Sequence, residues 1–237
     1  MSTSQPLAIS DLPPPTGADP VTFGGDTLDL TLEPGEALFV RRSSLILADG
    51  PMDLTTKLIA KRRFGIFSTF SGEVRWANRY EATCGPLTIV AGRDFHGTIA
   101  ALRVTPDETC HIQPGLYLAH RGTLSFDTKR VAKKEFWTLT KVEGDGTVYL
   151  KVPGRPRLKD LPHDPMILDT NYVAAIAGAF TAHGKVFKRT ELIKRGELEN
   201  VRIAGEGVVL LQSENPGEIS SGGGGGPFGL IGDLLPF

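Results

Sequence analysis

The chain has 237 residues, with 26 Lys and Arg against 27 Asp and Glu, which gives a formal net charge of −1. This balance excludes a polycation that coats nucleic acid and an acidic disordered chain. The apolar share of 40% is enough to bury a sizeable core, and the length is compatible with one all-β domain. A content of 28 Gly and 17 Pro predicts many turns.

Residues 1–20 are predicted to form a flexible N-terminal arm, because they contain the run Pro13-Pro14-Pro15 among Ser, Gly and Asp. The first basic residue of the chain is Arg41. A secretory signal requires a basic first segment, and a mitochondrial presequence is rich in Arg, so neither is predicted. No stretch reaches the roughly 18 apolar residues that a membrane span requires. We therefore expect a cytoplasmic protein.

Residues 21–215 are predicted to form a single all-β domain. Alternation of apolar and polar residues, the pattern of half-buried strands, recurs in residues 28–32, 99–104 and 147–152. The segment 207–211 is continuously apolar, which is typical of a strand covered on both faces. Helical periodicity is weak, and its best candidate is the short segment from Lys185 to Arg195.

An internal repeat divides this domain. Three segments open with Pro-x-acid and continue to an aliphatic-Ala pair and a glycine: Pro34 to Glu36 with Leu47-Ala48 and Gly50, Pro106 to Glu108 with Leu118-Ala119 and Gly122, and Pro162 to Asp164 with Val173-Ala174 and Gly178. The repeat predicts three related antiparallel units, at about 21–105, 106–160 and 161–215, each too small to be stable alone. We expect a pseudo-threefold arrangement whose strand edges join further subunits in a homo-oligomer.

The turn and strand motifs resemble those of the "altered inheritance of mitochondria" family and its bacterial and archaeal relatives. The residues that carry the resemblance are 35–40, 114–119, 152–154 and 205–212, and the Gly-rich tail is similar to tails of bacterial members. The resemblance covers about 23–215. It implies a β fold similar to the tryptophan RNA-binding attenuator protein, related to a double-stranded β-helix. It also implies a role in organising the mitochondrial inner membrane, but the absence of a presequence argues against that role for this chain. The family supplies no catalytic residues.

No catalytic or metal-binding constellation is evident, and we predict neither an enzyme nor a cofactor. The two cysteines, Cys84 and Cys110, form no CxxC motif. We interpret them as buried thiols, with a disulfide as the alternative. The five histidines include no His-x-His pair of the kind found in barrel metalloenzymes; His111 and His120 lie on either side of the turn at Pro114-Gly115. A small-ligand or metal-dependent barrel enzyme is the least favoured hypothesis.

Clusters of basic residues indicate where an anion or a nucleic acid would bind. The candidate contacts are Lys61, Arg62, Arg63, Lys129, Arg130, Lys133 and Lys134. Phe64, Phe136 and Trp137 adjoin these clusters, and aromatic faces can stack on bases. If the clusters share one face, they would attract phosphates of nucleic acid or of anionic lipid.

The C-terminal segment 216–237 is predicted to be a Gly-rich tether, Gly222 to Gly226, followed by an apolar tail. The candidate docking residues of this tail are Phe228, Leu230, Ile231, Leu234, Leu235 and Phe237. The tail either folds back on its own domain or docks on a neighbouring subunit, another protein or an anionic membrane surface. We therefore expect a non-enzymatic scaffold that self-associates or organises partners at a membrane, with a nucleic-acid-binding module as the alternative.

Overall fold

The computed structural model describes residues 21–59, 76–93, 95–131, 137–184 and 200–215. These residues form antiparallel strands and two short 3₁₀ turns, η3 (Pro114–Leu116) and η4 (Thr170–Tyr172), so the predicted all-β class is confirmed. The predicted arm (1–20), the tail (216–237) and the candidate helix at Lys185 to Arg195 lie outside the described residues.

The strands fall into three consecutive groups. The first comprises β1 (Val21–Phe23), β2 (Leu28–Leu32), β3 (Ala37–Arg41), β4 (Leu45–Asp49), β5 (Met52–Leu58), β6 (Trp76–Ala82) and β7 (Leu87–Ala91). The second comprises β8 (Gly97–Val104), β9 (Cys110–Ile112), β10 (Tyr117–Arg130) and β11 (Thr138–Pro153). The third comprises β12 (Arg157–Asp160), β13 (Met166–Asp169), β14 (Val173–Gly184) and β15 (Asn200–Leu211).

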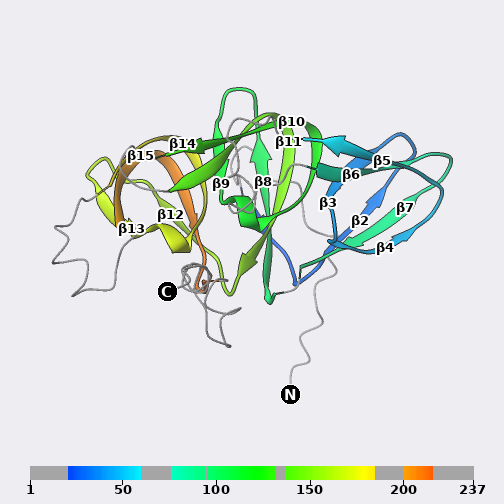
Figure 1. Ribbon diagram of the computed structural model, residues 1–237, viewed down its shortest axis with the longest axis horizontal. Helices are drawn as coiled ribbons and strands as arrows, with labels where there is room; N and C mark the ends of the chain where they lie inside the picture. The colour runs from blue at the N-terminus through cyan, green and yellow to red at the C-terminus, as the bar shows by residue number, and fades with distance from the viewer. Residues whose placement is uncertain (1–20, 60–75, 94, 132–136, 185–199, 216–237) are drawn as a thin grey trace, which may run out of the picture.

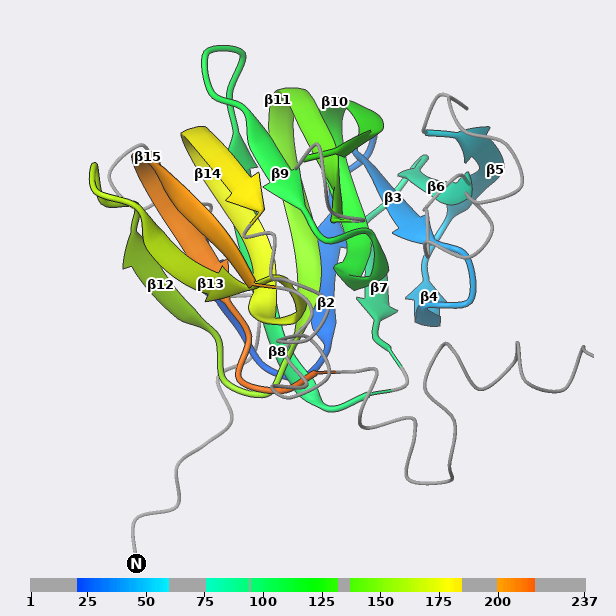
Figure 2. The same ribbon diagram turned by 60° about the vertical axis from the view of Figure 1, so that its left-hand side comes forward.

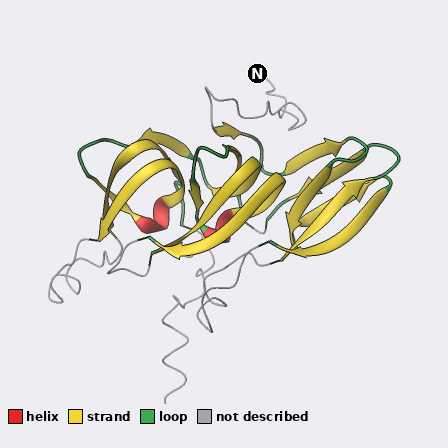
Figure 3. Ribbon diagram, turned by 90° about the horizontal axis from the view of Figure 1, so that it is seen from above, coloured by secondary structure: helices red, strands yellow, loops and turns green. Residues whose placement is uncertain are grey.

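Most of these strands belong to one 12-stranded sheet. Its main path runs β12-β15-β14-β9-β11-β10-β3-β6-β5, while β13 pairs with β15, β8 with β11, and β1 with β8. A separate three-stranded sheet has the order β2-β7-β4. The molecule is elongated, with β12 and β13 at one end of its longest axis and β4 and β5 at the other (Figure 1). The turned views in Figures 2 and 3 show the same succession of strand groups.

Strands β8 and β11 lie between two hydrophobic cores. Alternate residues of β11 enter different cores: Val148 and Leu150 join one cluster, and Tyr149 joins the other. The prediction that segments 99–104 and 147–152 are half-buried is therefore wrong. Both of their faces are covered, because strands of neighbouring groups pack on each side. Even Lys151, whose position in the alternation predicts exposure, is 1% exposed.

Each group contains one long hairpin, formed by β4 and β5 with β6 and β7, by β10 with β11, and by β14 with β15. The three hairpins have the same register. Each contains one extra residue, between Leu45 and Leu47, between Tyr117 and Ala119, and between Val173 and Ala175. Four positions after the extra residue comes a glycine with positive φ: Gly50 (133°), Gly122 (90°) and Gly178 (104°). A Cβ atom at any of these glycines would lie 2.3 or 2.4 Å from a carbonyl oxygen of the opposite strand, so only glycine fits.

This register corrects the equivalences assumed in the sequence repeat. The glycines are equivalent as predicted, and each lies 14 positions after the opening acid, at 36 and 50, 108 and 122, and 164 and 178. The aliphatic-Ala pairs are not equivalent. Because the extra residue is Ile46, Leu118 or Ala174, Ala48 corresponds to His120 and Ile176. The boundaries of the three units and their pseudo-threefold arrangement stay predictions.

The first two junctions between strand groups use equivalent strands. At the first, β3 pairs with β10, with Val40 opposite Ala119. At the second, β9 pairs with β14, with Ile112 opposite Ala175. The η3 turn also contributes to the first junction, because the guanidinium groups of Arg41 and Arg93 both donate hydrogen bonds to the carbonyl oxygen of Gly115.

Candidate functional site

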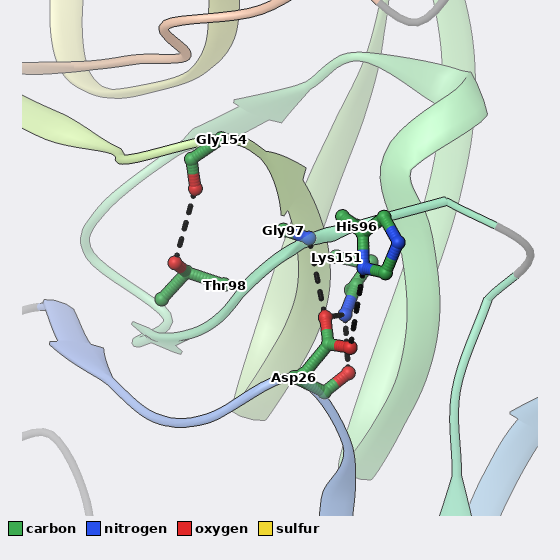
Figure 4. A network of polar contacts seen from close by, with 6 residues as sticks. All are labelled: Asp26, His96, Gly97, Thr98, Lys151 and Gly154. Atoms are coloured by element: carbon green, nitrogen blue, oxygen red, sulfur yellow. Dashed lines mark hydrogen bonds and ion pairs between the residues drawn. The ribbon is translucent and has the colours of Figure 1, made fainter.

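A buried ammonium group anchors the segment before β2. Lys151 in β11 donates to both the carboxylate and the backbone carbonyl of Asp26 (Figure 4). The Asp26 carboxylate also accepts a hydrogen bond from the Gly97 backbone N–H at 3.2 Å, and His96 Nδ1 lies 3.9 Å away. The hydrogen bond from Lys151 lowers the pKa of Asp26 and outweighs the opposing effect of burial. Because the ammonium is buried and bonded within the protein, we interpret this network as a structural tether.

A buried histidine lies among aromatic rings at the first junction. The ring of His120 stacks on that of Phe39, with centroids 4.5 Å apart and an angle of 4° between the planes. Its Nδ1 lies 2.7 Å from the Tyr117 hydroxyl, and the ring of Phe126 contacts it from another direction. Burial lowers the pKa of His120 to about 3 and raises that of Tyr117. The imidazole is therefore neutral near pH 7 and packs as a core residue that solutes do not reach.

Two open grooves occupy corresponding places beside the hairpins. The smaller encloses about 490 Å³ and is lined by residues that include Glu36, Arg121 and Gly122. The larger encloses about 610 Å³ and is lined by residues that include Glu108, Gly178 and Glu206. In each, an opening acid of the repeat faces a hairpin glycine of the next strand group. The grooves are therefore products of the repeated packing.

The charges of these grooves are of mixed sign. In the smaller groove, Arg103 donates to the Asp145 carboxylate. In the larger, Lys141 Nζ lies 2.5 Å from the carboxylate of Glu143, and Asp107 and Glu108 line the wall.

The cysteines and histidines do not assemble a metal site within the described ranges. Both cysteines are free, so the alternative of a disulfide between them is wrong. The interpretation as buried thiols is confirmed for Cys110 and wrong for Cys84, which is exposed. Burial raises the pKa of Cys110 to about 12, which keeps it as a thiol. His111 contacts Phe180 edge to face, away from the ring stack of His120. No cluster of metal-ligating side chains is found among the residues that the structure describes.

The most distinctive surface is the apolar face of β5. Directly opposite residues of an antiparallel pair share a face, so Leu54 lies on the same face as Tyr80, and Leu58 on that of Trp76. Tyr80 is buried in the core, whereas Leu54, Leu58 and Trp76 are about half exposed, at 55%, 58% and 46%. The core-forming face of the sheet therefore continues beyond the core without a covering layer of described residues.

The neighbouring strand β4 is exposed in the same way. It lies at the edge of the three-stranded sheet, and Leu45, Ile46 and Leu47 are 37%, 62% and 48% exposed. We define the open edge as the exposed apolar residues of β4, β5 and the start of β6: Leu45, Ile46, Leu47, Met52, Leu54, Leu58 and Trp76. Exposed apolar residues on strands with an edge that no described strand covers are characteristic of protein interfaces.

A sequence match that extends over nearly the whole domain identifies the family of this chain. The family described as "Mitochondrial biogenesis AIM24" matches residues 23–214, which is nearly the whole described domain. The chain belongs to the AIM24 family. This confirms the resemblance inferred from the turn and strand motifs.

A solved bacterial structure shares the fold of this AIM24 protein. The crystal structure of a Streptococcus pyogenes protein superposes with a TM-score of 0.66 at 20% sequence identity, covering 85% of this chain and 97% of that chain. At this identity the similarity demonstrates a common fold alone. A comparison with curated proteins finds no match.

The structure places few of the site residues predicted from the sequence. Five of the seven basic candidates, Lys61, Arg62, Arg63, Lys133 and Lys134, lie outside the described residues, as do the tail candidates Phe228, Leu230, Ile231, Leu234, Leu235 and Phe237. Lys129 and Arg130 lie at the end of β10, where only their backbone is described. The prediction that the basic clusters share one face therefore stays a prediction, as does the docking of the tail. In the described part of the chain, no helix is long and apolar enough to cross a membrane.

Sequence reasoning missed the open edge. The alternation Met52, Leu54 and Leu58 was available as a signal for a strand. The same alternation is also typical of a strand whose apolar side is buried. Only the tertiary structure shows that this side is exposed.

Proposed function

We propose that this AIM24 protein is a non-enzymatic assembly protein, which self-associates through its open edge. The observation that carries the proposal is the exposed apolar face of β5, continuous with the core-forming face at Tyr80. Burying a Leu side chain contributes about 1.5–3 kcal/mol. Burial of Leu54 and Leu58 against a second copy is thus a substantial driving force for association.

The polar features of the described domain support a structural role. Lys151 is bonded to Asp26, Arg103 to Asp145, and Arg79 to Glu81, each within the protein. The Lys151–Asp26 pair joins β11 to the segment before β2, the Arg103–Asp145 pair joins β8 to β11, and the Arg79–Glu81 pair lies within β6.

The proposal is tested by sedimentation of the full-length protein over a wide range of concentration, comparing Leu54→Glu with Thr55→Glu. The two variants add the same charge to the same strand, but Thr55 lies on the opposite face. Wild type and Thr55→Glu are expected to sediment as multimers, and Leu54→Glu as a smaller species, with folding checked by circular dichroism.

Two results contradict the proposed function. One is a wild-type protein that is monomeric at every concentration. The other is a multimer whose mass is unaffected by Leu54→Glu, because Leu54 would then lie outside the contact between copies.

A further inference from the structure

In each of the first two groups, the strand that follows the opening acid pairs with the hairpin of the next group. In the first group this strand is β3, whose Val40 lies four residues after the opening acid Glu36 and opposite Ala119 of β10. In the second group it is β9, whose Ile112 lies four residues after Glu108 and opposite Ala175 of β14. Ala119 and Ala175 each follow the extra residue of their hairpin, so the two junctions have one register.

Counting four residues from the opening acid also identifies the strand of the third group that corresponds to β3 and β9. Four residues after the third opening acid, Asp164, comes Leu168 in β13. β13 pairs with β15, as β3 pairs with β6 and β9 with β11. Among the described strands, β13 has no partner on its other side. The strand that completes a junction is therefore missing at this end of the molecule.

A strand of the kind that pairs with β3 and β9 is present at the opposite end of the molecule. β4 is the first-group equivalent of the start of β10 and of β14, and Leu47 follows its extra residue as Ala119 and Ala175 follow theirs. β4 pairs with β7, and its other edge has no partner among the described strands. The two strands lie at opposite ends of the longest axis in Figure 1, so one chain does not join them to each other.

Equivalent residues are buried where two strand groups meet and exposed on the two strands that lack a partner. The extra residues Leu118 and Ala174 are fully buried where their hairpins meet a neighbouring strand group, whereas their equivalent Ile46 is 62% exposed. On the other side, Ile167 of β13 is 56% exposed. Apolar side chains are thus exposed on both strands at the positions that a junction would cover.

We propose that β4 of one copy of this chain pairs antiparallel with β13 of a second copy, with Leu47 opposite Leu168 and Ala48 opposite Ile167. This inference rests on the proposed self-association and specifies the strands and register that meet. The contact is heterologous, because different surfaces of the two copies are joined, so it generates a ring or an open chain of subunits.

The chemistry of the two strands is compatible with this register. The residues at its centre are apolar on both strands, Leu47 and Ala48 against Ile167 and Leu168. Asp49 and Asp169 lie at opposite ends of the antiparallel pair, so their carboxylates do not face each other. The backbone groups of each free edge gain hydrogen-bond partners.

The register is tested by disulfide cross-linking of full-length chains in a Cys84→Ser background, which removes the exposed thiol. Chains carrying Ala48→Cys are mixed with chains carrying Ile167→Cys under a mild oxidant. This pair corresponds to His120 and Phe39, whose rings are in contact at the first junction. The matched control mixes Ala48→Cys with Leu168→Cys, which is one position away and on the other face of β13.

A mixed disulfide dimer from the first mixture and its loss in the control support the proposal. If sedimentation shows a multimer but the two mixtures cross-link equally or not at all, the register is wrong and the proposed function stands. If the wild type is monomeric at every concentration, both fail. Formation of an internal disulfide by one chain carrying Ala48→Cys and Leu230→Cys contradicts the proposal, because its own tail then occupies β4.

A second measurement does not depend on disulfide geometry. Leu47→Glu and Ile167→Glu change exposed residues at opposite ends of the molecule. Each variant alone is expected to lower the sedimenting mass while the circular dichroism spectrum is retained. If either folded variant keeps the wild-type mass, its strand does not take part in the contact.

Discussion

The hairpin β10–β11 and the hairpin that begins with β4 have the same register but opposite surroundings. Leu118 is fully buried at the centre of the molecule, whereas its equivalent Ile46 is 62% exposed at one end. The difference arises from the neighbouring strand, which is β3 for β10 and is absent for β4 among the described residues. One local structure thus forms a core where a neighbour covers it and an association surface where none does.

The largest loss of stability is expected from substitution of the hairpin glycines, because only glycine fits at these positions of the shared register. Gly122→Ala is expected to reduce the free energy of unfolding by about 3 kcal/mol or more, since its Cβ would lie 2.3 Å from the Asp145 carbonyl oxygen. Gly35→Ala is the control, because Gly35 also has positive φ but no atom within 4 Å of its Cβ position. It should cost about 1–2 kcal/mol. Denaturant titration measures both, and equal losses would refute the need for close approach at Gly122.

The next largest effect is expected at the buried Leu118, in comparison with its exposed equivalent Ile46. Leu118→Ala is expected to destabilise the fold by about 2–5 kcal/mol, because it leaves a cavity in a packed core. Ile46→Ala should change the stability of dilute protein by less than about 0.5 kcal/mol. Denaturant titration at low protein concentration compares the two. A large loss for Ile46→Ala in monomeric protein would show that this residue is covered within its own chain.

A further effect depends on pH and concerns the neutral histidine at the first junction. The folded pKa of His120, about 3, is below the unfolded value of 6.5, so the unfolded chain binds the proton first as the pH falls. Its contribution to stability is therefore complete above pH 6.5 and is lost progressively toward pH 3.

The variant His120→Phe isolates this contribution from the carboxylates that titrate in the same range. It keeps an aromatic ring beside Phe39 and Phe126 but removes the titrating group. Unfolding free energies measured from pH 7 to pH 4 should fall less steeply for the variant than for the wild type. Parallel curves would show that His120 is accessible to protons in the folded state.

Local pattern was sufficient to predict the class of fold and the repeat. The all-β class and the strand at Leu28 to Leu32 followed from alternation and turn residues, because these are properties of short segments. The equivalence of Gly50, Gly122 and Gly178 was also visible, since a backbone conformation that only glycine tolerates leaves a mark in the sequence.

Burial was predicted less well. The alternation in 147–152 indicated one exposed face, yet Thr147 and Lys151 are buried, because a second layer of strands covers that face. Lys151 tolerates this position through its bonds to Asp26, which lies 125 positions away in the sequence. No local pattern records such a distant partner.

The sequence by itself thus determined that this chain forms antiparallel strands in a repeated hairpin, and identified its AIM24 family. The tertiary structure decided which copies of the hairpin are covered and which are exposed. The physical reason is that secondary structure depends on neighbouring residues along the chain, whereas burial depends on the strand that happens to lie alongside. β4 has β7 on one side and no described strand on the other, and its exposed residues form part of the open edge.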